Sequence, residues 1–288
     1  MSTDQQARGI VVLGAGVMGT GITALALGFG LRVTLVDVDR AVLDRAAAAV
    51  RLQLRHARMM GALPEECSPG ELVTALTAEA AARADAVIEA ITEDAALKAK
   101  VLGEVSALMP AGVPLISNTS GIPIDELAEA VARPQDLLGT HFMNPTYLIT
   151  MVEVVRGPRT GDAALAATLE LLSRVRRQCV VVADSPGFVT SRLLHPMIND
   201  AARLVQEGTA GVADVDRLME GCLGHPTGPL RTADLIGIDN LVDALDALHE
   251  RTGDERSRPC ALLREKVRAG DLGRKSGRGF YDYGEGIS

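Results

Sequence analysis

One histidine and one glutamate, His141 and Glu153, could form an acid/base pair in this sequence. His141 closes a short apolar run, and Glu153 interrupts another apolar run between Val152 and Val154. A carboxylate in such a strand is costly to bury without a partner, and an imidazole is a natural partner. A histidine held by a carboxylate is the usual general base near neutral pH. The alternative is a partly exposed strand glutamate beside a loop histidine.

The composition limits the class of protein. The chain has 288 residues, of which 47% are hydrophobic, and a net charge of −8. This charge argues against nucleic acid or an anionic membrane surface as a partner. The longest apolar runs fall short of the roughly 18 residues of a membrane span, and the polar start does not resemble a signal peptide. The cysteines are scattered without metal-ligand spacing, so we expect a cytoplasmic protein with reduced cysteines and no metal.

The order of apolar runs and helical patterns predicts an α/β first domain. Residues 9–14 and 32–37 have the character of buried strands, and a helical pattern lies between them. This β-α-β unit predicts a Rossmann-type, doubly wound and mostly parallel sheet. Long helices are expected at 41–60 and 162–177, and a further helix that runs through Ala80. The remaining strands are predicted at 85–89, 113–117, 137–142, 152–155 and 179–182.

A second domain begins after the last predicted strand. Asp184-Ser-Pro-Gly187 interrupts the pattern, and the sequence beyond it has helical spacing throughout. We place the domains at 1–185 and 186–288. The second domain is predicted to be all-helical, with helices at 191–207, 212–223, 232–251 and 259–268.

A glycine-rich turn connects the first strand to the first helix. It reads Gly14-Ala-Gly16-Val17-Met18-Gly19. In this context the glycines permit a tight turn, a close approach to a pyrophosphate and close packing of helix on strand. The helix N-terminus stabilises the phosphate charge. Asp37 closes the second strand, where an acid accepts the ribose hydroxyls of NAD and repels the extra phosphate of NADP. We therefore predict an NAD site.

A polar segment, Ser117-Asn118-Thr119-Ser120, follows the strand predicted at 113–117. Ligands bind at this carboxyl edge in open α/β sheets, so an amide and a hydroxyl here could orient a substrate and the nicotinamide ribose. The alternative is that Ser120 caps the helix that starts near Ile124.

These motifs together resemble the 3-hydroxyacyl-CoA dehydrogenase family, in its short bacterial 3-hydroxybutyryl-CoA form. The resemblance extends over essentially the whole chain. It rests on 14–19, 89–93, 117–120, 141–145 with Glu153, 186–188, 225–229 and 272–281. Each motif is modest alone, but their common order is specific.

The resemblance implies a role for most of these residues. His141 is the general base on the 3-hydroxyl of a 3-hydroxyacyl thioester, Glu153 orients it, and Ser120 binds the reacting oxygen. NAD accepts the hydride, and no metal is needed. Glu93, Lys98 and Asn118 line the nicotinamide and its ribose, while the turn with Val17 and Met18 meets the phosphates. Asn144 lies on the substrate side. The helical domain would close the substrate cleft and form a homodimer.

The departures from the family pattern fall on the substrate side. Ser191 stands where the family usually has an asparagine three residues after Pro-Gly-Phe, and Asn199 lies too far along the helix to replace it. Gly121 replaces a usual serine, and the loop after His141 is altered at Met143, Thr146 and Tyr147. Arg55 and Arg58 stand where lysines often meet the CoA phosphates.

Three other functions remain open at this point. The same chemistry on a hydroxyacyl unit tethered to an acyl carrier protein, as in polyketide extender-unit biosynthesis, would account for the substrate-side changes. A free hydroxy acid of the gulonate or carnitine type would need a charged clamp such as Arg192 or Arg231. A non-catalytic NAD-binding protein would be expected to have lost His141, Glu153 or Ser120, which are all present.

Overall fold

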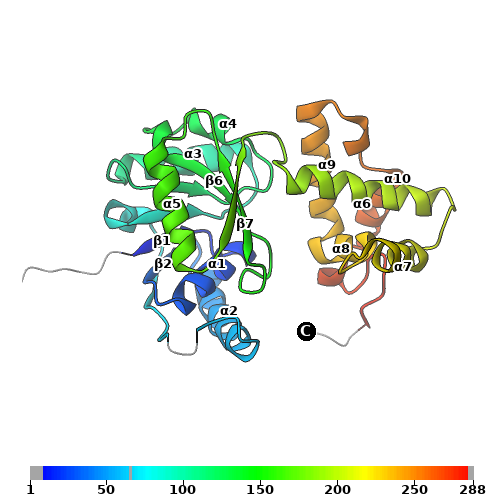
Figure 1. Ribbon diagram of the computed structural model, residues 1–288, viewed down its shortest axis with the longest axis horizontal. Coiled ribbons are helices and arrows are strands. Elements are labelled where there is room, and N and C mark those ends of the chain that lie inside the picture. Colours follow the sequence, from blue (N-terminus) through cyan, green and yellow to red (C-terminus); the bar gives the residue numbers. More distant parts are fainter. Residues whose placement is uncertain (1–8, 65–66, 285–288) are drawn as a thin grey trace, which may run out of the picture. The chain divides into compact units, whose positions relative to one another are not determined.

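The computed structural model describes residues 9–64 and 67–284, and these divide into two compact units. One unit ends at Phe188 and the other begins at Val189. The first is an α/β unit built on one sheet, and the second is helical (Figure 1). The predicted class, a Rossmann-type sheet followed by a helical region, is confirmed. Among the described residues no helix is long and apolar enough to cross a membrane.

The sheet of the first unit has eight strands in the order β3-β2-β1-β4-β5-β6-β7-β8. All neighbouring strands are parallel except β6 and β7, which are antiparallel. The strands are β1 (Ile10–Leu13), β2 (Val33–Val36), β3 (Leu72–Ala75), β4 (Ala86–Glu89), β5 (Leu115–Ser117), β6 (Leu137–His141), β7 (Met151–Arg156) and β8 (Gln178–Ala183). The strand order reverses direction between β1 and β4, which is where such sheets bind ligands.

Helices cover both faces of this sheet (Figure 1). Alternate residues of the central strands point to opposite faces and enter two separate apolar clusters. For example, Val12 belongs to a cluster with residues of α1 (Val17–Gly28), α2 (Arg40–Met59) and α5 (Asp162–Arg174), whereas Val11 belongs to a cluster with residues of α3 (Ala95–Leu108) and α4 (Ile124–Ala128). Central strands buried on both faces account for the continuous apolar runs in the sequence.

The prediction of a helix that runs through Ala80 is wrong. The chain forms β3 there, followed by the 3-10 helix η1 (Ala78–Arg83). The Val33 amide donates to the Glu71 carbonyl, and β3 continues beside β2 as the edge strand. The alanine-rich composition favoured a helix locally, but pairing with the edge of β2 overrides that propensity.

The second unit contains five α-helices in its described part: α6 (Thr190–Gln206), α7 (Val212–Leu223), α8 (Pro229–Ile236), α9 (Ile238–Thr252) and α10 (Ala261–Ala269). They enclose one apolar cluster. The single helix predicted at 232–251 is instead α8 and α9, because Gly237 has φ of +96° and ends the first of them. The Ile238 amide then donates to the Leu272 carbonyl instead of continuing α8.

Two buried aspartates fasten the C-terminal segment to this helical core. Asp216 accepts hydrogen bonds from the amides of Leu230 and Arg231 and from the Tyr281 hydroxyl. Asp234 accepts from the amides of Phe280 and Tyr281 and from the Tyr283 hydroxyl. Burial, together with the hydrogen bond to Asp216, raises the pKa of Tyr281 to about 12. Burial and the charge of Asp234 raise the pKa of Tyr283 to about 12.

Candidate active site

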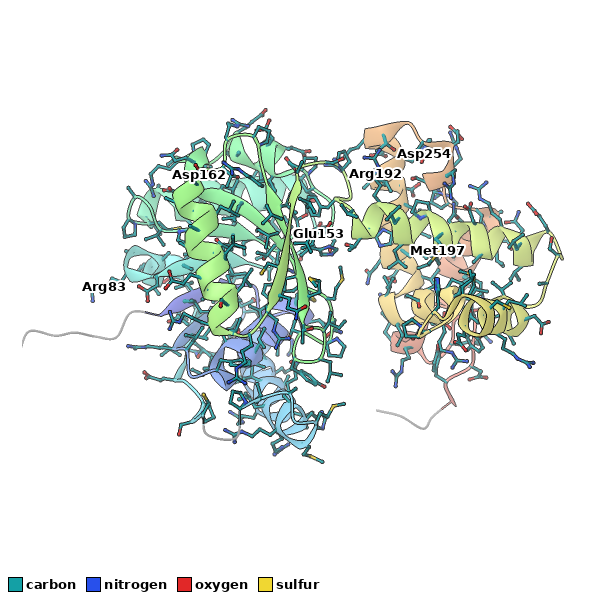
Figure 2. The ribbon with its side chains drawn as sticks, in the orientation of Figure 1. Arg83, Glu153, Asp162, Arg192, Met197 and Asp254 are labelled. Carbon is teal, nitrogen blue, oxygen red and sulfur yellow. The ribbon has the colours of Figure 1, made fainter. Side chains whose placement is uncertain are left out.

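His141 and Glu153 meet across two neighbouring strands. In the antiparallel ladder of β6 and β7, His141 is the direct partner of Glu153. Their side chains therefore project from the same face, and His141 Nδ1 lies 3.2 Å from Glu153 Oε2. Both residues are only 6% exposed. Glu153 lies within the first unit in Figure 2. The alternative of an exposed glutamate beside a loop histidine is wrong.

Two further residues fix the surroundings of His141. The Asn118 side-chain oxygen accepts a hydrogen bond from the Phe142 amide, which holds the chain immediately after the histidine. The Phe188 ring meets the imidazole edge-on, with ring centroids 6.1 Å apart. Phe188 has φ of +49°, a left-handed conformation that a residue with a large side chain seldom adopts. Strain at a residue that contacts the imidazole is typical of a functional site.

Ser120 does not cap a helix. The first residue before α4 is Pro123, without a side-chain cap, and Asp184 accepts the Ile124 and Asp125 amides instead. Ser120 follows β5 with its side chain exposed at the carboxyl edge, as expected for substrate contact. The capping alternative is therefore wrong, and Asp184, sixty residues further along the chain, performs that task.

A buried network of charged side chains lies behind Ser120. The Ser120 amide and the Thr119 hydroxyl both donate to Glu93 Oε1. Glu93 Oε2 lies 3.3 Å from Lys98 Nζ, and Lys98 is itself fully buried against Glu89. Glu93 remains 44% exposed on its side chain and is therefore accessible to a ligand. The side chains of Lys98 and Glu89 are fully buried and are therefore not accessible to a ligand.

The glycine-rich turn has the shape that a dinucleotide requires. Gly14 has φ of +93°, and a Cβ there would lie 2.6 Å from the Ala90 carbonyl oxygen. A Cβ on Gly19 would lie only 1.8 Å from the Gly14 carbonyl oxygen, so helix α1 packs against the turn at a distance only glycine permits. At Gly16 there is open space, and the first turn of α1 contains no acidic residue. An anionic pyrophosphate fits these features. Val17 and Met18 begin α1, with Val17 exposed.

Asp37 follows β2 and contacts this turn. Its Oδ2 atom accepts the Ala15 amide at 2.9 Å, and its Oδ1 atom accepts the Asp39 amide. The carboxylate is half-buried beside the turn, where the ribose hydroxyls of a dinucleotide would donate to it. The aspartate therefore both braces the turn and offers an acceptor.

The loop after His141 is held by a residue that the sequence analysis did not single out. Arg177 is buried and donates to the carbonyl oxygens of Thr146, Ile149 and Val175. Burial lowers the pKa of its guanidinium. Thr146 is itself buried against Gly21, whereas Asn144 is exposed, as a substrate contact requires. Two of these contacts, to Thr146 and Ile149, link residues about thirty positions apart, so no local pattern indicated them.

Arg55 and Arg58 are not brought to the same place as these residues. Both are exposed near the end of α2, which starts after Asp39. At 1.5 Å per residue they lie roughly 22 and 27 Å along the helix from its start. Arg58 also lines a hollow of about 450 Å³ together with Leu63 and Cys67.

Ser191 belongs to the second unit. It is the second residue of α6 and is 5% exposed. Asn199, on the same helix, uses its side-chain amide in other hydrogen bonds. Its Nδ2 donates to the carbonyls of Arg256 and Arg258, and its Oδ1 accepts the Cys260 amide. Asn199 is thus a structural residue, as expected. Arg192 and Met197 of the same helix are labelled in Figure 2.

Comparison with known proteins identifies both parts of the chain. Residues 9–185 match the family model "3-hydroxyacyl-CoA dehydrogenase, NAD binding domain", and residues 187–283 match "3-hydroxyacyl-CoA dehydrogenase, C-terminal domain". The chain is 40% identical to the probable 3-hydroxybutyryl-CoA dehydrogenase of Bacillus subtilis, covering 97% of this chain and 98% of that protein.

Solved structures agree with this assignment. Mycobacterium tuberculosis FadB2 is 36% identical with a TM-score of 0.90, covering 96% of this chain and 99% of that one. The (S)-3-hydroxybutyryl-CoA dehydrogenase PaaH1 from Ralstonia eutropha is 35% identical with a TM-score of 0.87 and the same coverage. The first unit is thus an NAD-binding domain, and the resemblance that the motifs indicated is confirmed. The chain belongs to the 3-hydroxyacyl-CoA dehydrogenase family.

Proposed function

We propose that this protein catalyses the reversible, NAD-dependent oxidation of a 3-hydroxyacyl-CoA thioester to the 3-oxoacyl thioester, with His141 as the general base. The observation that carries this proposal is the buried contact between His141 Nδ1 and Glu153 Oε2 in a member of this family. Oxidising an alcohol requires removal of a proton and of a hydride from one carbinol group. NAD, when bound, accepts the hydride.

The histidine would remove the hydroxyl proton through its second ring nitrogen. When Nδ1–H donates to a carboxylate, the neutral ring carries its accepting lone pair on Nε2. Glu153 then orients the ring and stabilises the imidazolium that forms. The exposed Ser120 hydroxyl would donate to the substrate oxygen, and Asn144 would contribute on the substrate side.

The remaining assignments concern the cofactor. The turn from Gly14 to Gly19 would hold the pyrophosphate, and Asp37 the adenosine ribose. Glu93, with its exposed face, would accept a hydroxyl of the nicotinamide ribose. Asn118 holds the backbone after His141 and so sets the histidine relative to the nicotinamide.

NAD reduction by the purified protein tests this function. We would measure NADH formation with 3-hydroxybutyryl-CoA, with longer 3-hydroxyacyl-CoA esters and with the corresponding free acids. Turnover of the esters and not of the acids supports the proposal. Turnover of free acids alone would instead favour the gulonate- or carnitine-like alternative.

A second candidate substrate is a 3-hydroxyacyl unit carried by an acyl carrier protein. The end of α2 exposes Arg51, Arg55 and Arg58 beside Leu52 and Met59, a basic and apolar surface on a chain of net charge −8. An acidic carrier protein with an apolar contact face would complement it.

Charge reversal distinguishes the two carriers. The double variant Arg55→Glu/Arg58→Glu should raise the KM for a carrier-bound substrate about tenfold or more, because each reversal turns an attraction into a repulsion. Arg174→Glu, at an exposed arginine of α5, is the matched control. If the wild type turns over the CoA ester more efficiently than the carrier-bound ester, the carrier assignment is wrong.

We also propose that the protein forms a homodimer through its helical unit. Leu193, Leu218, Leu223 and Leu235 are between 52% and 69% exposed on α6, α7 and α8. Light scattering at several concentrations tests this. Replacing Leu218 and Leu223 with aspartate should yield monomers if these leucines lie in the interface.

A further inference from the structure

Glu89 is a buried carboxylate that the proposed reaction does not use. It is the last residue of β4 and is fully buried. Its Oε2 atom accepts the Ser117 hydroxyl at 2.6 Å, and its Oε1 atom accepts the Ile91 amide and the Lys98 ammonium. A carboxylate with no exposed surface and three hydrogen-bond donors around it cannot itself meet substrate or cofactor.

Lys98, like Glu89, is fully buried and fully hydrogen-bonded. Its ammonium group lies 2.6 Å from Glu89 Oε1, 3.3 Å from the Ile91 carbonyl oxygen and 3.3 Å from Glu93 Oε2. An ammonium has three N–H donors, and these three acceptors account for them. Lys98 is thus fully buried, and each of its three N–H groups has an acceptor in the network.

Glu93 transmits this arrangement to the reaction site. One of its oxygens faces Lys98, and the other accepts the Ser120 amide at 2.7 Å together with the Thr119 hydroxyl. Without Lys98, two carboxylates would face each other with no cation between them. Without Glu89, the ammonium would keep only a half-exposed partner and could move with it toward solvent.

We propose that Glu89 is a positioning residue for Ser120. Glu89 fixes Lys98, Lys98 fixes Glu93, and Glu93 fixes the backbone N–H of Ser120. The order of contacts runs from β4 and β5 through α3 to the loop that presents the Ser120 hydroxyl. The inference deepens the proposed function, on which it rests for the role of Ser120, but the geometry of the network does not depend on that role.

Hydrogen/deuterium exchange of the full chain without cofactor or substrate tests the proposal. The Glu89→Gln variant keeps the shape of the side chain and removes its charge. We expect the Ser120 amide to exchange about tenfold faster in this variant, while amides of β1 and of the second unit are unchanged. Asp136→Asn, which removes a buried carboxylate that pairs with Arg133 away from this network, is the matched control and should leave Ser120 unchanged.

A double variant separates positioning from stability. Lys98→Met alone leaves Glu89 buried without a cation and should lower the melting temperature strongly. Glu89→Gln/Lys98→Met removes both charges and should recover most of that loss. In the double variant the Ser120 amide should still exchange fast, and kcat should stay about tenfold below the wild type at equal folded fraction, because Glu93 still lacks its cation.

Two results would overturn the proposal. One is an unchanged exchange rate for the Ser120 amide in Glu89→Gln and in the double variant. The other is an equal increase at all amides, which would make Glu89 a general stability residue. The exchange experiment needs no substrate, so its failure is distinguishable from a failure of the wild type to oxidise any thioester.

Discussion

His141 and Glu153 are direct partners in the antiparallel ladder between β6 and β7, with Nδ1 and Oε2 3.2 Å apart. The residues between them form a loop that Arg177 holds from its own position before β8. The contact between His141 and Glu153 therefore rests on a strand register, not on a flexible loop. Register in a sheet buried on both faces is strongly specified, because a slip of one residue would turn Glu153 to the opposite face.

Ser120 and Asp184 should respond to mutation in opposite ways. Asp184→Ala should lower the free energy of unfolding by about 1–2 kcal/mol, because the Ile124 and Asp125 amides lose their acceptor. Ser120→Ala should leave stability unchanged and lower kcat/KM about 10- to 100-fold, the loss of one hydrogen bond to the reacting oxygen. Urea unfolding and steady-state kinetics check both variants. A loss of stability in Ser120→Ala would restore the capping role.

Asp37 should decide the choice of cofactor. Asp37→Ser removes the acceptor for the ribose hydroxyls and the brace on the Ala15 amide, so kcat/KM with NAD should fall about 10- to 100-fold. The preference for NAD over NADP should fall with it, since the repelling charge is gone. Asp39→Ala is the control: it removes the cap on the Ala41 amide and should lower stability without changing cofactor preference. Equal NADP discrimination in Asp37→Ser would contradict the assignment.

Tyr281 and Tyr283 should make stability depend on alkaline pH. Burial and the Asp216 and Asp234 carboxylates raise the pKa of each hydroxyl to about 12, against a pKa of about 10 in an unfolded chain. The folded state thus favours the protonated form. Its contribution is fully present below about pH 10 and is lost as pH rises toward 12, because only the unfolded chain releases these protons.

Urea unfolding at several values between pH 9 and 12 (about one pH unit apart) measures this loss. The Tyr281→Phe/Tyr283→Phe variant should lose stability less steeply over that range. Tyrosinate absorbance gives an independent reading, since the chain has only three tyrosines and no tryptophan. If the tyrosines all titrate together near their ordinary pKa of about 10, the two aspartate contacts do not hold in solution.

Much of this arrangement could be predicted from the sequence. The glycine turn, Asp37 and the polar end of β5 were found because each sits next to an apolar run that forms a strand. The His141–Glu153 contact was inferred because a carboxylate in an apolar strand needs a partner. These inferences depend only on the spacing of nearby residues and on the cost of burying a charge, and both can be judged from the sequence alone.

The features that the sequence did not predict all depend on contacts between segments that are distant in the chain. Strand β3 was missed because its stability comes from pairing with β2 and not from its own alanine-rich surroundings. Asp184 caps α4 from a distance of sixty residues. The ion pair between Lys98 and Glu89 was not predicted either, because it joins a helix to a strand and has no signature in the local sequence.

Ser191 offers a test of the substrate-side departures. Ser191→Asn should raise kcat/KM for the CoA ester roughly tenfold, because the longer amide offers two N–H donors and a separate carbonyl acceptor, whereas the shorter hydroxyl has one donor. Thr190→Asn, at the neighbouring exposed position of α6, is the control. An unchanged kcat/KM would mean that Ser191 does not limit activity on the CoA ester.

The most direct test of the central claim is the initial rate of NADH formation from 3-hydroxybutyryl-CoA by the wild type, His141→Gln and Glu153→Gln. The account predicts a kcat about 10²- to 10⁴-fold lower in His141→Gln, a smaller loss in Glu153→Gln, and NADH binding unchanged in both. Turnover of the ester by His141→Gln at the wild-type rate would contradict it.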